Sequence, residues 1–236
     1  MMINIKRLFF VCSIFSIFLM GIGMNAQRVN KFDENKKRTG VWKKYHPNKR
    51  IRYIGTFKDG KEIGTFKFYD IRTSNYPSAI KKFQKNSDTV AVSFYYLYKP
   101  NLKTKGKMVG KKRVGKWVYY YSNGNILSEE FYRDGKLHGD LKTYYKNGKV
   151  TEHSQYKNGL LDGVSKKYSD SEVLIEEVIF VGGKENGIAK YYELNGNLKE
   201  TGMYKNGFRK GKWEFYIDGE FSGNKKKKEK YKKENK

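Results

Sequence analysis

The stretch Gly115–His138, GKWVYYYSNGNILSEEFYRDGKLH, decides the fold. It contains two runs rich in aromatic and aliphatic residues, KWVYYY and ILSEEFYR, and each run is followed by a tight-turn signal. The signals are Asn123-Gly124 and Asp134-Gly135, the dipeptides that two-residue hairpin turns of the primed type favour because such turns need positive φ. The stretch therefore predicts two antiparallel strands, each ended by a hairpin turn.

The same unit recurs along the chain with a period of 24 residues. A glycine opens the copies at Gly40, Gly64, Gly115, Gly139, Gly163, Gly187 and Gly211. A tyrosine recurs five positions after the start of each copy, at Tyr45, Tyr69, Tyr96, Tyr120, Tyr144, Tyr168, Tyr192 and Tyr216. One step, from Tyr69 to Tyr96, is 27 residues long, and Ala91 replaces the opening glycine there. A fixed period is typical of a repeat array, in which neighbouring units supply each other's core.

We therefore expect an all-β fold, an elongated single-layer antiparallel sheet of consecutive β-hairpin repeats of about 24 residues each. The array should occupy residues 40–223, with an irregular repeat at 64–90 that contains three extra residues and Pro77. An insertion in a repeat array usually forms a loop on one face. Residues 27–39 should form a polar lead-in, and residues 224–236, NKKKKEKYKKENK, a basic disordered tail.

Three apolar positions in each copy share one parity: the recurrent tyrosine, an aliphatic residue six positions later, and an aromatic or apolar residue six positions further. Equal parity places side chains on one face of a strand unless a bulge intervenes. We therefore expect one face to carry a continuous aromatic and aliphatic stripe, and the opposite face to carry Trp42, Trp117 and Trp213. Small residues two positions before the last aromatic, such as Gly55 and Gly106, should leave room for a ring from the adjoining strand.

Residues 1–26 have the pattern of a secretory signal peptide: a short basic start, an apolar run from Leu8 to about Ile22, and Ala26 before Gln27. Serines and glycines interrupt the run, and it is shorter than the ~20 apolar residues of a spanning helix. Cleavage is therefore favoured over a membrane anchor, and we expect no transmembrane segment in the mature chain. The expected location is outside the cytoplasm: periplasmic, on the cell surface or secreted.

The formal net charge is +26, from 50 basic and 24 acidic residues. Such an excess attracts anionic lipids, polymers and acidic proteins, and it equally well keeps an aromatic-rich chain in solution. Lysines outnumber arginines, which favours diffuse point charges over forked phosphate contacts. In the tail, a lysine near an anionic membrane contributes about 1 kcal/mol, or these residues are simply solvated. The tail residues concerned are Lys225, Lys226, Lys227 and Lys228.

No catalytic residue, metal site or cofactor is expected. The segment Gly110–Trp117, GKKRVGKW, comes close to a phosphate-binding loop, but that loop needs Ser or Thr after its lysine and a helix to follow. His46, His138 and His153 occupy different repeat positions and lack metal-ligand spacing. The single cysteine, Cys12, lies in the leader, so a mature chain forms no disulfide. These features predict a protein that is not an enzyme.

The aromatic residues allow two interpretations. The recurrent tyrosines are favoured as core, because each unit must bury something against its neighbour. For the rings outside that register, burial and a binding surface are equally favoured, since both faces of a single-layer sheet are not buried alike. Exposed rings beside lysines could stack on sugars or bases. The rings in question are Tyr119, Tyr121, Tyr145, Tyr191 and Phe215.

The segment Phe131–Gly139, FYRDGKLHG, resembles a MORN motif (membrane occupation and recognition nexus), in which tyrosine, an Asn/Asp-Gly-Lys turn and His-Gly follow one another. Tyr156–Gly159 and Tyr204–Gly207 repeat the core of the motif, and the extra Asn-Gly hairpin resembles the variant MORN repeats of bacteria. The resemblance covers about residues 40–223. It implies consecutive antiparallel hairpins in a long grooved sheet, and non-enzymatic roles such as scaffolding, self-association, and membrane or protein binding. Some variant-repeat proteins carry an antitoxin label.

We therefore expect an exported, non-enzymatic binding or scaffold module for a protein or an anionic component of the cell envelope. Self-association stays open. An antitoxin or immunity protein that neutralises a toxin is one alternative, suggested by the resemblance, and a glycan-binding module is another. Nucleic acid is a poor partner for an exported protein.

Export predicts that the native mature protein begins near Gln27, because the leader ends with Ala26 at that junction. N-terminal sequencing of the protein isolated from its own cells checks this. A native chain that begins at Met1 or Met2 would contradict export by cleavage.

Overall fold

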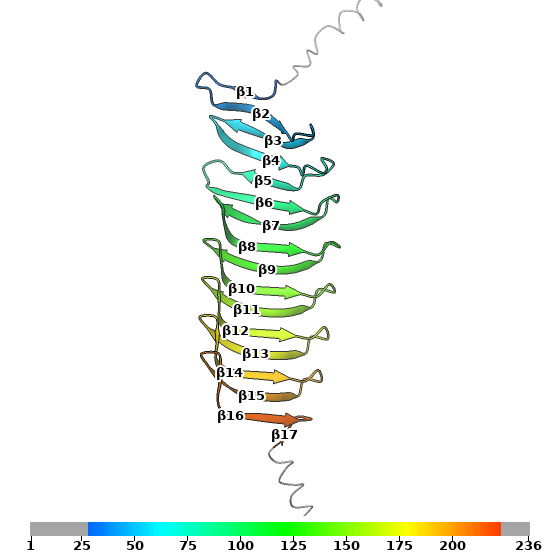
Figure 1. Cartoon of the computed structure of the whole chain (residues 1–236), viewed down its shortest axis with the longest axis vertical. Helices are drawn as coiled ribbons and strands as arrows, with labels where there is room; N and C mark the ends of the chain where they lie inside the picture. Colours follow the sequence, from blue (N-terminus) through cyan, green and yellow to red (C-terminus); the bar gives the residue numbers. More distant parts are fainter. Residues whose placement is uncertain (1–27, 223–236) are drawn as a thin grey trace, which may run out of the picture.

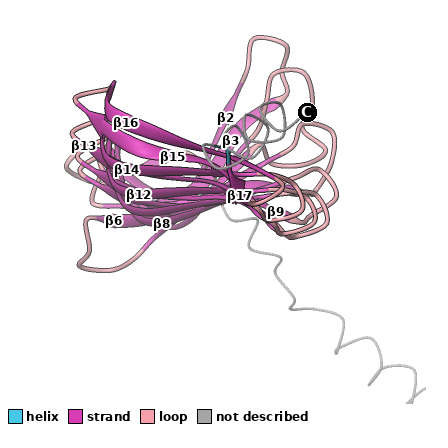
Figure 2. Cartoon of the chain, turned by 90° about the horizontal axis from the view of Figure 1, so that it is seen from below, coloured by secondary structure: helices cyan, strands magenta, loops and turns pink. Residues whose placement is uncertain are grey.

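The computed structural model describes residues 28–222, which form one 17-stranded sheet. Each strand pairs antiparallel with the next strand in the chain, so the order in the sheet is the order in the sequence (Figure 1). Seen end-on, the strands overlie one another in a single curved layer with turns on both sides (Figure 2). The prediction of an all-β, elongated sheet of consecutive hairpins is confirmed. The predicted leader and basic tail lie outside the described residues.

The strands are β1 (Lys31–Phe32), β2 (Arg38–Tyr45), β3 (Ile51–Lys58), β4 (Lys61–Phe68), β5 (Ala79–Phe83), β6 (Thr89–Tyr95), β7 (Leu102–Val109), β8 (Lys112–Tyr120), β9 (Ile126–Arg133), β10 (Lys136–Tyr144), β11 (Val150–Lys157), β12 (Leu160–Tyr168), β13 (Leu174–Val181), β14 (Lys184–Tyr192), β15 (Leu198–Lys205), β16 (Phe208–Ile217) and β17 (Glu220–Phe221).

The two turns of a repeat differ. At Asp134 and Gly135, between β9 and β10, φ is 51° and 82°, as a primed two-residue turn requires. At the other end of β9, the Gly124 amide donates a hydrogen bond of 3.0 Å to the carbonyl of Tyr121, and Gly124 alone of residues 122–124 has positive φ, at 95°. This is a longer loop closed by one left-handed glycine. The prediction of a primed two-residue turn is therefore confirmed for Asp134-Gly135 and wrong for Asn123-Gly124.

The opening glycines mark β-bulges. All seven have positive φ, from 63° at Gly115 to 140° at Gly187. Pairing between β9 and β10 shifts register between Leu137 and Leu141, the residues that flank Gly139. A left-handed glycine at a bulge bends the strand and adds a residue on one side of the ladder. This backbone requirement explains why a glycine recurs at this position.

Because bulges interrupt every regular copy, parity is not conserved along a repeat. The rings of Trp117 and Tyr132 lie 6.3 Å apart between centroids, and those of Trp213 and Tyr204 lie 5.1 Å apart. Trp117 therefore shares a face with the last aromatic position of its own repeat, and Trp213 with that of the preceding repeat. The predicted stripe, with tryptophans on the opposite face, was wrong because it counted parity through the bulges.

One row of cross-strand neighbours, which we name the core row, runs along this face. Phe66 is 0% exposed, Trp117 1% and Ala189 0%. The core row consists of Trp42, Gly55, Phe66, Lys81, Val92, Gly106, Trp117, Glu130, Leu141, Ser154, Ser165, Val178, Ala189, Gly202 and Trp213. We name the face that carries it the core face.

Neighbours in the core row are complementary in size. A Cβ added at Gly106 would overlap the ring of Trp117, so this ring lies across bare backbone. The same relation holds for Phe66 over Gly55 and for Trp213 over Gly202, as the small residues predicted. Where no large ring is present, small side chains meet, as at Ser154 and Ser165, whose hydroxyls are 2.7 Å apart.

The irregular repeat departs from this pattern. Residues 69–78 form a loop in which the Arg72 guanidinium, hydrogen-bonded to Asp70, lowers the pKa of that carboxyl to about 2. Strands β4, β5 and β6 pair without a register shift, and Ala91 lacks the positive φ of the opening glycines. Consequently Ser93, two residues after Ala91, faces away from the core row, whereas Trp117, two residues after Gly115, belongs to it.

We expect Gly106→Ala to lower the free energy of unfolding by about 2–3 kcal/mol, because the added methyl group overlaps a ring that is packed on all sides. In a Trp117→Leu background the same change should lower the free energy of unfolding by less than about 1 kcal/mol, because the ring that the methyl group overlaps is gone. Urea denaturation of the four proteins measures the coupling. Equal costs in both backgrounds would contradict the ring-on-glycine contact.

Candidate functional site

The face opposite the core row carries a second continuous row. Successive side chains of a strand point to opposite faces, so the neighbour of each core-row residue belongs to it. We name it the lysine row: Lys43, Ile54, Lys67, Ile80, Ser93, Lys105, Val118, Glu129, Lys142, His153, Lys166, Glu177, Lys190, Thr201 and Glu214. We name this side of the sheet the lysine face.

Charge is distributed unevenly along the lysine row. Its later part contains both lysines and carboxylates, and Lys166 Nζ lies 3.0 Å from Glu177 Oε2. Glu129 is paired with Lys116 at 2.6 Å, and this ammonium group lowers the pKa of the Glu129 carboxyl. From Lys43 to Val118 the row contains three lysines and no carboxylate. The uncompensated positive charge therefore lies over β2 to β8.

The recurrent tyrosines lie beside this row. Lys105 Nζ is 5.6 Å from the ring centroid of Tyr120, and the Tyr144 hydroxyl donates to Glu129 Oε2 at 3.2 Å. Tyr45 is 49% exposed, and the other seven are half-buried. Their role as core stays a prediction.

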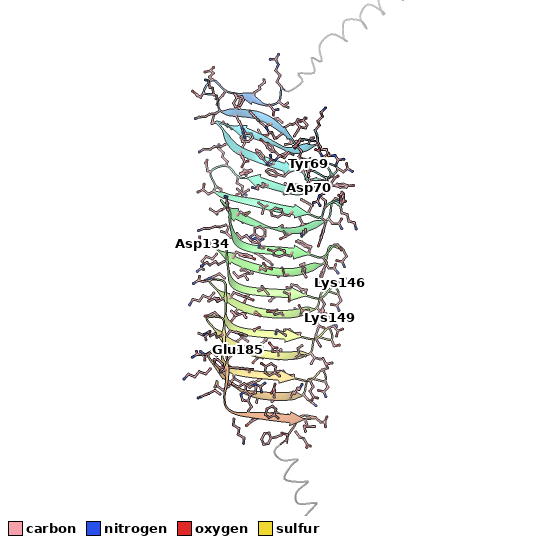
Figure 3. The ribbon with its side chains drawn as sticks, in the orientation of Figure 1. Tyr69, Asp70, Asp134, Lys146, Lys149 and Glu185 are labelled. Carbon is pink, nitrogen blue, oxygen red and sulfur yellow. The ribbon has the colours of Figure 1, made fainter. Side chains whose placement is uncertain are left out.

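Tyr121 and Tyr145, predicted as candidate binding rings, connect consecutive turns at one end of the strands. The Tyr121 hydroxyl donates to the Tyr144 carbonyl at 2.7 Å, and the Tyr145 hydroxyl donates to the Tyr168 carbonyl at 3.0 Å. Tyr96 makes the equivalent bond to the carbonyl of Tyr120, at 2.8 Å. Figure 3 labels residues at both ends of the strands. Tyr69, Asp70, Lys146 and Lys149 lie at this end, and Asp134 and Glu185 lie at the other.

The remaining off-register rings lie on the core face. The Tyr119 hydroxyl accepts a hydrogen bond of 2.6 Å from Arg113, and Tyr191 stacks on Trp213 with centroids 6.4 Å apart. Burial raises the pKa of both tyrosines. Phe215 lies at the end of the array and is 47% exposed. The five rings therefore occupy two separate parts of the sheet and do not form one patch.

A signal that sequence reasoning missed accompanies each tryptophan. The segments RTGVW, RVGKW and RKGKW each place an arginine four residues before the tryptophan, on the far side of the opening glycine. The guanidinium carbons of Arg38, Arg113 and Arg209 lie 4.9, 4.7 and 3.9 Å from the centroids of their tryptophan rings. An arginine over a ring face is a stabilising cation–π contact, and the bulge between the two residues brings them together.

Within 28–222, no three His, Cys, Asp or Glu side chains gather in a way that could hold a metal ion. His153 Nε2 lies 3.3 Å from Asp140, whereas His46 Nε2 contacts the Tyr69 carbonyl oxygen at 3.0 Å, so the histidines act separately. The same part of the chain contains no helix of sufficient length and apolarity to cross a membrane.

Comparison with known families agrees with this architecture. A family model described as the MORN repeat variant matches residues 38–59, 113–134, 137–158 and 185–206. Each match begins in an even-numbered strand, spans one hairpin and ends on the first residue of a two-residue turn. No curated protein matches the chain.

We expect Tyr145→Phe to lower the free energy of unfolding by about 1 kcal/mol, because the variant loses one hydrogen bond between consecutive turns and keeps the ring. Denaturant titration of the purified chain measures the change. Tyr98→Phe, a change at an exposed turn tyrosine, is the control and should leave stability unaltered. A Tyr145→Phe protein as stable as the wild type would contradict a structural role for this hydroxyl.

Proposed function

We propose that this repeat-based binding module, four segments of which match the MORN repeat variant model, is exported and non-enzymatic and that its lysine face holds an anionic component of the cell envelope. The leader pattern of residues 1–26 supports export. The repeat fold supports binding, since stacked repeats present side chains in extended surfaces.

One observation carries the proposal: the lysine row is continuous, open and in its first half uncompensated. Lys43 and Lys67 are separated by one strand, so their attachment points are about 10 Å apart. Neither has a carboxylate within ion-pair distance among residues 28–222. Charges repeated along a rigid surface bind a repeating anionic partner through many weak contacts, and multivalency turns these into firm attachment.

The test compares three lysines of each face. Lys43/Lys67/Lys190→Gln removes positive charge from the lysine row, while Lys44/Lys81/Lys167→Gln removes the same charge from the core face. At about 1 kcal/mol per lysine near an anionic surface, the first variant should bind phosphatidylglycerol vesicles about a hundredfold more weakly at low salt. The core-face variant should bind nearly as the wild type does.

High salt should shrink all these differences, because exposed charges are screened beyond the Debye length. Lys225–Lys228→Gln, in the tail outside the described residues, measures the separate contribution of the tail. Equal losses in both face variants would mean that net charge, not the lysine row, drives binding. Capture of one toxin-like protein by a chain that ignores vesicles would instead favour the antitoxin alternative, and retention on polysaccharide would favour the glycan-binding one.

A further inference from the structure

A hollow of about 450 Å³ lies on the lysine face, over β5 to β8. Ala91 and Ser93 of β6 form part of its floor, and Lys82 of β5 and Lys107 of β7 flank Ala91 in direct register. Because alanine and serine are short and lysine is long, the lysine stems rise on both sides of a low central strand. In the neighbouring rung Ser93 lies between Ile80 and Lys105.

The hollow results from the irregular repeat. In regular copies the residue two positions after the opening glycine lies in the core row, as Trp117 does. Ala91 replaces that glycine and no bulge occurs, so Ser93 turns to the lysine face and leaves it without a large side chain. The floor is mainly apolar, with Ile80 and Val118 contributing.

The hollow is strongly cationic. Four lysines and no carboxylate line it: Lys82, Lys105, Lys107 and Lys116. Only Lys116 has an ion-pair partner among the described residues, Glu129 at 2.6 Å. The positions one repeat after Lys105 and Lys107 are Glu129 and Phe131, so this concentration of charge does not recur in the next copy. Three ammonium groups are therefore left to bind a ligand.

We propose that this hollow is a binding site for a diphosphate group. Lysine acts on phosphate as a point charge with three donors. Lys82 and Lys107 belong to strands about 10 Å apart, a gap that two linked phosphates span better than one. The Ser93 and Tyr95 hydroxyls in the lining are further donors. The inference rests on the proposed function in that both place an anionic ligand on the lysine face.

Calorimetric titration of the full chain with inorganic pyrophosphate tests the site, with orthophosphate and citrate as comparators at matched ionic strength. We expect pyrophosphate to bind at least tenfold more tightly than either comparator. A nucleoside diphosphate separates two sources of the group. Tighter binding than pyrophosphate supports a diphosphate carried on an organic group that contacts the apolar floor, and weaker binding supports the free anion. If neither diphosphate binds, the proposal is overturned.

Three variants locate the binding. Lys82/Lys107→Gln should weaken pyrophosphate binding about tenfold or more, since it removes two charged donors. Ala91→Leu fills the floor without changing charge and should weaken binding to a similar extent. Lys142/Lys190→Gln, with the same charge change elsewhere in the lysine row, should bind within twofold of the wild type. Wild-type affinity in Ala91→Leu, or an equal loss in Lys142/Lys190→Gln, would show diffuse attraction and no site.

Thermal melts establish whether each variant is folded. If Lys82/Lys107→Gln does not fold, the single variant Lys107→Gln replaces it. The titration uses no vesicles, and the vesicle assay leaves Lys82, Lys107 and Ala91 unchanged. A hollow that fails to bind diphosphate therefore leaves the lysine-row proposal standing, and failed vesicle binding leaves the hollow to be judged by its own titration.

Discussion

The fold depends on a ring lying across a glycine of the neighbouring strand. A single-layer sheet has no second layer against which to bury apolar surface, so each strand must cover the next one within the same face. Trp117 over Gly106 and Trp213 over Gly202 achieve this by removing the side chain beneath the ring. Arg113 and Arg209 then cover the outer surfaces of these rings. Burial in this protein is therefore local and repeated along the sheet, and among the described residues it is deepest in the core row.

The bulges decide what each face displays. A left-handed glycine such as Gly115 shifts the register of its strand against the preceding strand and places the following tryptophan in the core row. Where Ala91 takes this position, pairing continues without a shift and the faces of β6 are exchanged relative to regular copies. One missing glycine thus changes local packing and also produces the cationic hollow. Structure and candidate function are linked at this residue.

The two faces have different chemistry because alternation along each strand separates them. The core face carries rings, small residues and hydroxyls that satisfy each other, as Ser154 and Ser165 do. The lysine face carries long charged side chains whose stems pack on the sheet while the ammonium groups stay in water. Carboxylates such as Glu129 and Glu177 balance the later repeats, and the earlier repeats remain positive. This gradient along one face is what a family assignment alone does not reveal.

The 24-residue period, the hairpins and the order of the strands could be read from the sequence, because turn dipeptides and recurrent aromatics are local signals. The arginine of RVGKW also stands in the sequence, but its contact with the tryptophan ring was not predicted from it. Only the tertiary structure decided which face each side chain occupies. Parity counted through Gly139 or Tyr144 fails, since the register shifts there depend on pairing with neighbouring strands. The structural role of Tyr121 and Tyr145 likewise follows only from the tertiary structure. Their hydroxyls donate hydrogen bonds to carbonyls of the next repeat, and the spacing between strands sets this contact.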